Sequence, residues 1–153
     1  MIGICTIIKN LSANGRLRKE LLKEEYLRLI NRYLFIWTDK NVSQVGTSIL
    51  TQLSASYRHL AVEERSYKAF LESNCIEAWA RLIEVFPTNQ DLIFNVLRTL
   101  SKVSNYESIC NKLNEKKACL KSLSSFFKFY KANIHIIIRI AIIFAYSCFY
   151  LGI

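Results

Sequence analysis

The sequence predicts an all-α protein, a right-handed α-solenoid of about three three-helix repeats. A helix-ending phrase recurs along the chain, which is the first of three observations that predict it. The second is that only four glycines and one proline punctuate 153 residues, and the third is that no useful stretch alternates polar and apolar residues as a strand does. The phrase occupies residues 6–14 (TIIKNLSAN), 48–56 (SILTQLSAS), 95–105 (NVLRTLSKVSN) and 139–147 (RIAIIFAYS).

The spacing of the phrase matches that of helical repeats. Aligning Leu11, Leu53, Val103 and Ser147 gives steps of about 42, 50 and 44 residues, of which the middle one requires an insertion of several residues. A solenoid presents an extended surface to partners. We therefore expect one repeat domain over residues 1–153, made of the end of a repeat (1–14), three repeats (15–56, 57–105 and 106–147) and a divergent apolar tail (148–153).

The chain up to the end of the first repeat is predicted to hold four helices. Asn14-Gly15 separates the first two, because Asn and Gly favour turns. A second break is expected at residues 39–41, and Val45, Ile49 and Leu53 then form an apolar stripe at helical spacing. The four predicted helices are residues 2–12, 16–23, 26–37 and 42–53.

The second repeat is predicted to hold helices at residues 57–73, 75–86 and 91–103. The first of these segments is either one long helix or two helices divided near Glu63-Glu64. Pro87 ends the next helix, because proline cannot donate the hydrogen bond that continues it. Asp91 suits the start of the last helix, where a negative charge is favourable.

The third repeat is predicted to hold helices at residues 106–116, at 118–130 and from 134 onward. Apolar residues recur at helical spacing through the second of them. Asn133 is placed to accept a hydrogen bond from the first turn of the third. Residues 134–140 are rich in β-branched side chains, but their place after two helices favours a helix.

The C-terminal residues 134–153 contain only two polar interruptions and are long enough to cross a bilayer. Lys128 and Lys131 precede them, as basic residues do at a cytosolic membrane boundary. Two interpretations are open: the third helix of the last repeat, and a tail anchor of a membrane adaptor. The first is favoured, because Arg139 aligns with Asn95 of the preceding repeat and because a charge inside a membrane is costly.

The chain has a net charge of +9 and a pI near 9.4, which suits an anionic partner: acidic protein, nucleic acid or membrane surface. Its basic residues stand beside acidic ones, as in residues 16–20 and 23–25. This pattern is typical of solvated helix faces. A nucleic-acid-binding helical repeat is therefore a less favoured alternative, because it requires a clustered basic patch.

No pattern points to catalysis or to a metal. The two histidines, His59 and His135, have no recognisable acid–base partner, and no Gly-rich phosphate loop is present. We therefore expect no enzyme, no catalytic residue, no cofactor and no metal ligand. The apolar N-terminus lacks the basic region of a signal peptide. An odd number of cysteines without C-x-x-C spacing predicts reduced thiols in the cytosol: Cys5, Cys75, Cys110, Cys119 and Cys148.

The recurring unit resembles the armadillo repeat. The residues that carry the resemblance are Lys9–Ala13 (KNLSA), Ser101–Cys110 (SKVSNYESIC) and the helix pair 120–139. Units of about 42 residues whose third helix ends in N-L-S or N-L-A mark that family. The resemblance covers most of residues 4–147, and within the family it points to the axonemal and flagellar armadillo-repeat-containing proteins.

The chain departs from the family pattern in two respects. Family units often have glycine between the first and second helices, where this chain has residues 23–25 and 73–75. Nuclear-import members carry Trp and then Asn on each third helix to hold basic peptides, and of the corresponding positions here only Asn10 matches. Arg98 and Lys102 would repel a basic peptide and favour an acidic one.

The resemblance implies a non-enzymatic protein–protein interaction scaffold for assembly of the axoneme of motile cilia and sperm flagella, and so a role in spermatogenesis. It implies a cytoplasmic, ciliary or flagellar location and a protein partner, with acidic segments or axonemal components as candidates. The predicted partner-binding residues lie on the third-helix face: Lys9, Asn10, Gln52, Arg98 and Lys102.

Overall fold

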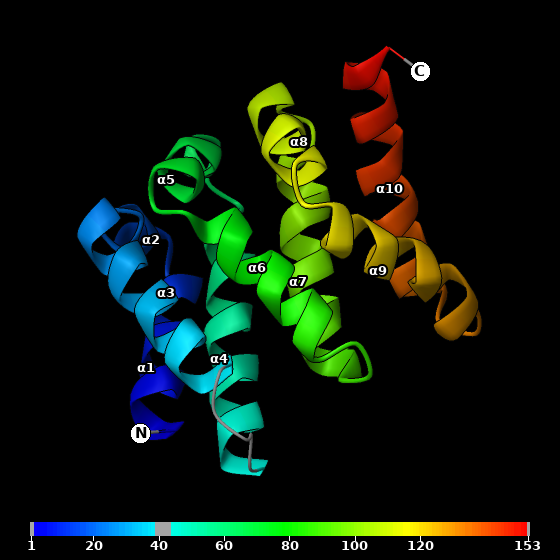
Figure 1. Ribbon diagram of the computed structural model, residues 1–153. Helices are drawn as coiled ribbons and strands as arrows, with labels where there is room; N and C mark the ends of the chain where they lie inside the picture. Colours follow the sequence, from blue (N-terminus) through cyan, green and yellow to red (C-terminus); the bar gives the residue numbers. More distant parts are fainter. Residues whose placement is uncertain (1, 39–43, 153) are drawn as a thin grey trace.

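The computed structural model describes residues 2–38 and 44–152, and all regular secondary structure within these ranges is helical. The all-α prediction is confirmed. The ten helices of these ranges (Figure 1) are α1 (Ile2–Ala13), α2 (Gly15–Leu21), α3 (Glu24–Thr38), α4 (Gln44–Leu60), α5 (Ser66–Glu72), α6 (Cys75–Val85), α7 (Gln90–Val103), α8 (Glu107–Asn114), α9 (Lys117–Phe129) and α10 (Ile134–Leu151).

The helices pack in two rows. In one row α1, α4, α7 and α10 each contact the next, and in the other row α3, α6 and α9 do so. The short helices α2, α5 and α8 lie along one edge of the array, at the top of Figure 1. The four helices that contain the recurring phrase therefore make up one row, called the phrase row below.

Asparagine side chains begin three of the helices. Asn133 accepts a hydrogen bond from the backbone N–H of Ile136 at 3.3 Å, which confirms its predicted role as the cap of α10. Asn89 caps α7 in the same way, although the sequence analysis assigned that helix start to Asp91 alone. Asn14 caps α2 and so explains the break that was expected there.

The segment predicted as residues 57–73 contains two helices rather than one. Its first residues extend α4 to Leu60, and a turn leads to α5, so the division near Glu63-Glu64 is observed. The acidic residues are good helix formers, so intrinsic propensity alone favours continuation. Tertiary contacts hold the turn: Glu63 pairs with Arg18 at 3.4 Å, and the Glu64 carbonyl accepts a hydrogen bond from Tyr106.

The remaining helix boundaries differ from the prediction by a few residues or less. The expected break at 39–41 and the expected helix start at Val42 lie outside the described residues. The C-terminal segment expected as a divergent tail instead continues α10 to Leu151. Gly152 ends that helix with φ 71°, a left-handed conformation that glycine adopts without strain.

Three aromatic side chains fill the space between α4, α5 and α6. Tyr57, Phe70 and Trp79 are fully buried, and their ring centroids lie 5.0–6.0 Å apart in edge-to-face pairs. Such pairs contribute about 0.5–1.5 kcal/mol each beyond the burial of their area. This cluster joins the phrase row to the second row.

A buried asparagine supports the same region. The amide nitrogen of Asn31 in α3 donates to the backbone carbonyl of Ser73 at 2.6 Å and contacts the sulfur of Cys75 at 3.3 Å. Its amide oxygen accepts a hydrogen bond from the hydroxyl of Tyr57. Burial raises the pKa of Tyr57 well above its usual value, so the hydroxyl stays protonated as this bond requires. One side chain thus links α3, α4 and the start of α6.

We expect Asn31→Ala to lower the free energy of unfolding by about 2–3 kcal/mol, because it leaves a buried hydroxyl and a buried carbonyl without partners. Chemical denaturation followed by circular dichroism measures the change. Asn111→Ala on the exposed side of α8 is the control and should shift stability by less than about 0.5 kcal/mol. Equal effects of the two variants would contradict the assigned role of Asn31.

Candidate protein-interaction surface

An open groove runs across the phrase row at α1, α4 and α7. Its volume is about 250 Å³. Carboxamide, basic and acidic groups share its walls with few apolar side chains, so it suits a polar ligand rather than an apolar one. It is lined by Lys9, Thr51, Gln52, Ala55, Arg58, Asp91, Phe94 and Asn95.

Helices α1, α4 and α7 each carry a serine at the same position of the recurring phrase, and this small side chain lets the helices pack closely. Each serine is buried, and each hydroxyl donates to the carbonyl three residues earlier in its own helix. A small side chain that satisfies its own hydroxyl can face a neighbouring helix without an unpaired polar group. The three bonds are Ser12 to Lys9 at 2.6 Å, Ser54 to Thr51 at 2.9 Å and Ser101 to Arg98 at 3.3 Å.

The serines also correct the alignment of the third phrase. They place Leu100, rather than Val103, in the position of Leu11 and Leu53. The difference is three residues, about one helical turn. In this alignment Thr99, rather than Lys102, corresponds to Asn10. Lys102 therefore lies about one turn farther along α7 than the position of Asn10, at which the resemblance predicted a peptide contact.

Asn95 joins α4 and α7 at the groove. Its amide nitrogen lies 3.4 Å from both the Thr51 carbonyl and the Ser54 hydroxyl oxygen, as hydrogen-bond donor to each. Its amide oxygen accepts a hydrogen bond from the guanidinium of Arg58 at 3.0 Å. Asn95 therefore fixes the contact between the two helices and holds the Arg58 side chain at the groove.

A cluster of positive charge surrounds His59, next to the groove. Burial lowers the pKa of His59, and the nearby charges of Arg58, Arg18, Lys9 and Arg98 lower it further. The cluster draws on α1, α2, α4 and α7. His59 is therefore neutral near pH 7 and lies in a positive field.

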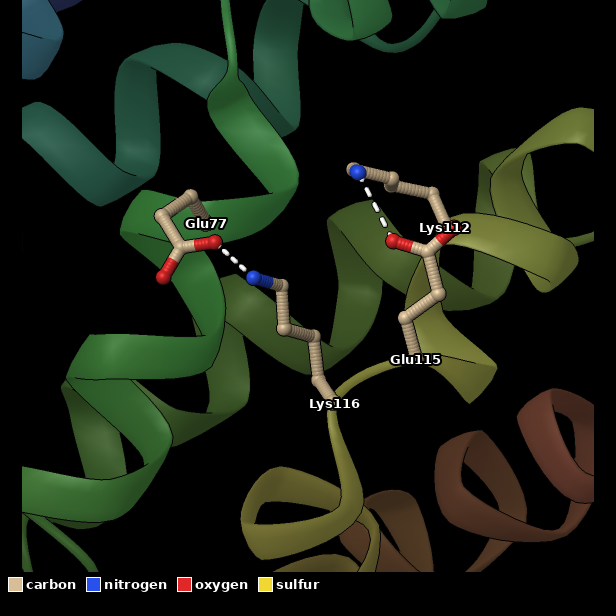
Figure 2. Close-up of polar contacts among 4 residues, drawn as sticks. All are labelled: Glu77, Lys112, Glu115 and Lys116. Carbon is tan, nitrogen blue, oxygen red and sulfur yellow. Dashed lines mark hydrogen bonds and ion pairs between the residues drawn. The ribbon is translucent and has the colours of Figure 1, made fainter.

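Some basic residues away from the groove, among them Lys23 and Arg28, have acidic partners. Figure 2 shows Lys116 paired with Glu77 of α6, and Lys112 paired with Glu115 at 2.7 Å. Of the groove cluster, Arg18 pairs with Glu63, and the ion pairs among the described residues include none for Lys9, Arg58 or Arg98. The cluster is thus a concentration of basic charge with little internal compensation.

The five predicted partner-binding residues have different outcomes. Lys9 and Gln52 line the groove, and Arg98 is exposed beside it with its guanidinium carbon 5.6 Å from the centroid of the Phe94 ring. Lys102 is exposed farther along α7, and Asn10 is exposed on α1 without lining the groove. The recurring phrase gives no signal for Arg58 and His59, because the predicted helix ends at residue 53, before both of them. Arg18 and Asn95 reach the groove region through contacts between helices, which the phrase does not encode.

The cysteines are thiols, four of them buried and Cys148 exposed. Burial raises the pKa of Cys75 and of Cys119 to about 12, so both remain protonated near neutral pH. Within residues 2–38 and 44–152, no three His, Cys, Asp or Glu side chains come close enough to share a metal ion. The arrangement at the groove is suited to binding anions by charge and hydrogen bonding.

Comparison with known proteins assigns no family: no protein-family model matches the chain, and no curated protein matches it. The functional interpretation therefore rests on the geometry and the charge of the groove.

We expect the pKa of His59, measured from its ring resonances by NMR, to lie below the usual value of about 6.5. As pH falls through that value, the unfolded chain gains the proton first, so the free energy of unfolding should decrease. Arg58→Gln should raise the pKa of His59 by removing a neighbouring charge. Lys117→Gln on exposed α9 should not change it, and equal shifts in both variants would contradict the charge cluster.

Proposed function

We propose that this protein is an armadillo-type right-handed α-solenoid of three-helix repeats that acts as a non-enzymatic scaffold. Its partners are proteins, and they bind at the groove formed by α1, α4 and α7. The observation that carries the proposal is the cluster of basic side chains beside carboxamide side chains at that groove, in which Lys9, Arg58 and Arg98 have no ion pair among the described residues. Charge and hydrogen-bonding groups arranged along successive helices suit an extended partner segment.

Hydrogen bonds between distant parts of the chain support the repeat architecture. Tyr106, Tyr130 and Tyr150 each donate to the backbone carbonyl of a residue 42, 43 or 45 positions earlier. Asn31 and Asn95 make similar bonds across 42 and 44 positions. These separations equal the length of one helical repeat, as expected where each unit contacts its neighbour.

The cellular part of the proposal comes from the resemblance of the sequence to axonemal armadillo-repeat proteins. On that basis the partners belong to the assembly of the axoneme in motile cilia and sperm flagella. Proximity labelling with the full chain in ciliated or spermatogenic cells tests the location, and recovery of axonemal proteins is the expected result. Labelling confined to other compartments would contradict the axonemal role without bearing on the groove.

Reversing the exposed positive charges of α7 beside the groove should weaken partner capture. We expect Arg98→Glu combined with Lys102→Glu to reduce recovery of co-purifying proteins about tenfold, because repulsion replaces attraction for an acidic segment. Pull-down from lysates of ciliated cells followed by quantitative mass spectrometry measures the change.

The matched control is Lys117→Glu combined with Lys121→Glu. These lysines are exposed on α9, have the same spacing of four residues and give the same change of net charge. Partner recovery should be unaffected. Equal loss in both double variants would indicate a nonspecific dependence on net charge, and no loss in either would contradict binding at this groove.

A tail-anchored membrane adaptor is the second candidate function, and the properties of α10 favour it. The helix has 18 residues and a mean hydropathy of 2.0, and 22% of it is buried. Against it, Ile136, Ile140 and Ile143 form a buried stripe at helical spacing, and α10 packs on α7, α8 and α9. Insertion into a bilayer would require this stripe to leave the other helices.

Extraction of cell membranes with alkaline carbonate separates the two candidates. The scaffold predicts that the full chain is released into the supernatant. Retention of the chain in the pellet would favour the anchor. In that case, replacing Ile138 and Ala141 on the outer side of α10 by Lys should abolish retention, because charge inside a membrane is costly.

A further inference from the structure

The four cations around His59 come from separate helices. Lys9 of α1 and Arg58 of α4 line the groove, and Arg58 lies 3.4 Å from Nε2 of His59. Arg98 of α7 lies over the ring of the groove residue Phe94, and Arg18 of α2 is the fourth cation whose charge acts on His59. Like charges held together disfavour the folded state, and a bound anion relieves that cost. A cluster built from four helices therefore forms a site only in the folded chain.

We propose that these four cations form one anion-binding site around His59, and that its ligand is a compact anionic group on a protein segment. A phosphorylated side chain and a run of carboxylates share this chemistry. The proposal rests on the proposed binding of protein partners at the groove, and it adds the chemical class that the groove selects. Arginine clusters recognise such groups through charge-assisted hydrogen bonds.

The guanidinium groups are already oriented. Arg58 is held by the amide oxygen of Asn95 at 3.0 Å, and its second terminal nitrogen lies 3.4 Å from the Nε2 atom of His59. Arg98 is supported by the ring of Phe94, and Arg18 by Glu63. The Nε atom of Arg18 is buried and lies 3.4 Å from Oε1 of Glu63, so this ion pair fixes the guanidinium. Preorganised donors lose less conformational entropy when they bind a ligand.

The groove favours a protein segment over a nucleic acid. Asp91 lines the groove and would repel a continuous row of phosphates. Phe94 lies beneath Arg98, which limits its use for stacking bases.

Ligand binding is coupled to protonation of His59. Its charged neighbours are Lys9, Arg18, Arg58 and Arg98, with Glu63 beside Arg18 and Asp91 in the groove. A bound anion offsets the repulsion from the cations and so raises the pKa of His59, which takes up a proton. Affinity for the anion should therefore increase as pH falls toward about 6.

The test uses the full chain and three fluorescein-labelled peptides of about twelve residues, built from Ser and Gly. One carries a central phosphoserine, one carries consecutive glutamates, and one carries neither. Fluorescence anisotropy should show at least one charged peptide binding about tenfold more tightly than the uncharged one. The relative affinity of the two charged peptides identifies which source of anion the site prefers.

Variants locate the site. Arg58→Gln and Lys9→Gln should each weaken binding of the charged peptides severalfold to tenfold, whereas Lys117→Gln on α9 should have no effect. Circular dichroism checks that each variant is folded. If Arg58→Gln does not fold, the affinity of Lys9→Gln for the charged peptides decides the test. His59→Gln should remove the increase in affinity toward about pH 6, which is measured with the glutamate peptide because phosphate itself titrates near that pH.

Equal affinity for the three peptides, or charged-peptide binding that is the same in wild type and in Lys9→Gln, would overturn the proposal. So would tighter binding of a single-stranded oligonucleotide that the same variants weaken, because the ligand would then be nucleic acid. The peptide-binding results can be distinguished from a failure of the proposed scaffold function. If the Arg98 and Lys102 double variant still loses cellular partners while the peptides bind equally, the groove binds proteins without selecting anions.

Discussion

The side chain of Asn95 sets the geometry on which the groove depends. Its amide nitrogen reaches the Thr51 carbonyl and the Ser54 hydroxyl on α4, and its amide oxygen holds Arg58. Buried polar groups must be paired, so these bonds disfavour any sliding of α7 along α4. Asn31 has a comparable place between α3, α4 and α6. Two buried asparagines thus fix relative helix positions that apolar packing alone would leave less specific.

The same contacts explain why several basic side chains from different helices lie together at one place on the surface. Close packing of α1, α4 and α7 places His59 in the combined field of Lys9, Arg58 and Arg98. Each residue taken alone is an ordinary basic side chain on a helix. Together they form the proposed anion-binding site only because the helices are held in register. The stability of the row and the proposed binding therefore depend on the same contacts.

Local patterns in the sequence were sufficient to predict most of the helices, although Val45 of the apolar stripe expected at residues 45–53 is exposed. Pro87 ends α6 as expected, and Asn133 caps α10. The turn after α4 was not resolved in advance, because Glu63 is held there by a residue far away in the sequence. Lys9 and Gln52, which the recurring phrase predicted as partner-binding residues, line the groove. Predicting the remaining groove residues requires knowing how far α4 extends and how the helices are aligned with one another. Local periodicity encodes neither.

The central claim is that the phrase row, rather than another face, contacts the partner. A photo-crosslinking amino acid introduced at the position of Gln52 in the groove, or at that of exposed Glu84 on α6, tests it most directly in ciliated cells. The account predicts covalent capture of a partner protein from position 52 and none from position 84. Capture from position 84 with none from position 52 would contradict it.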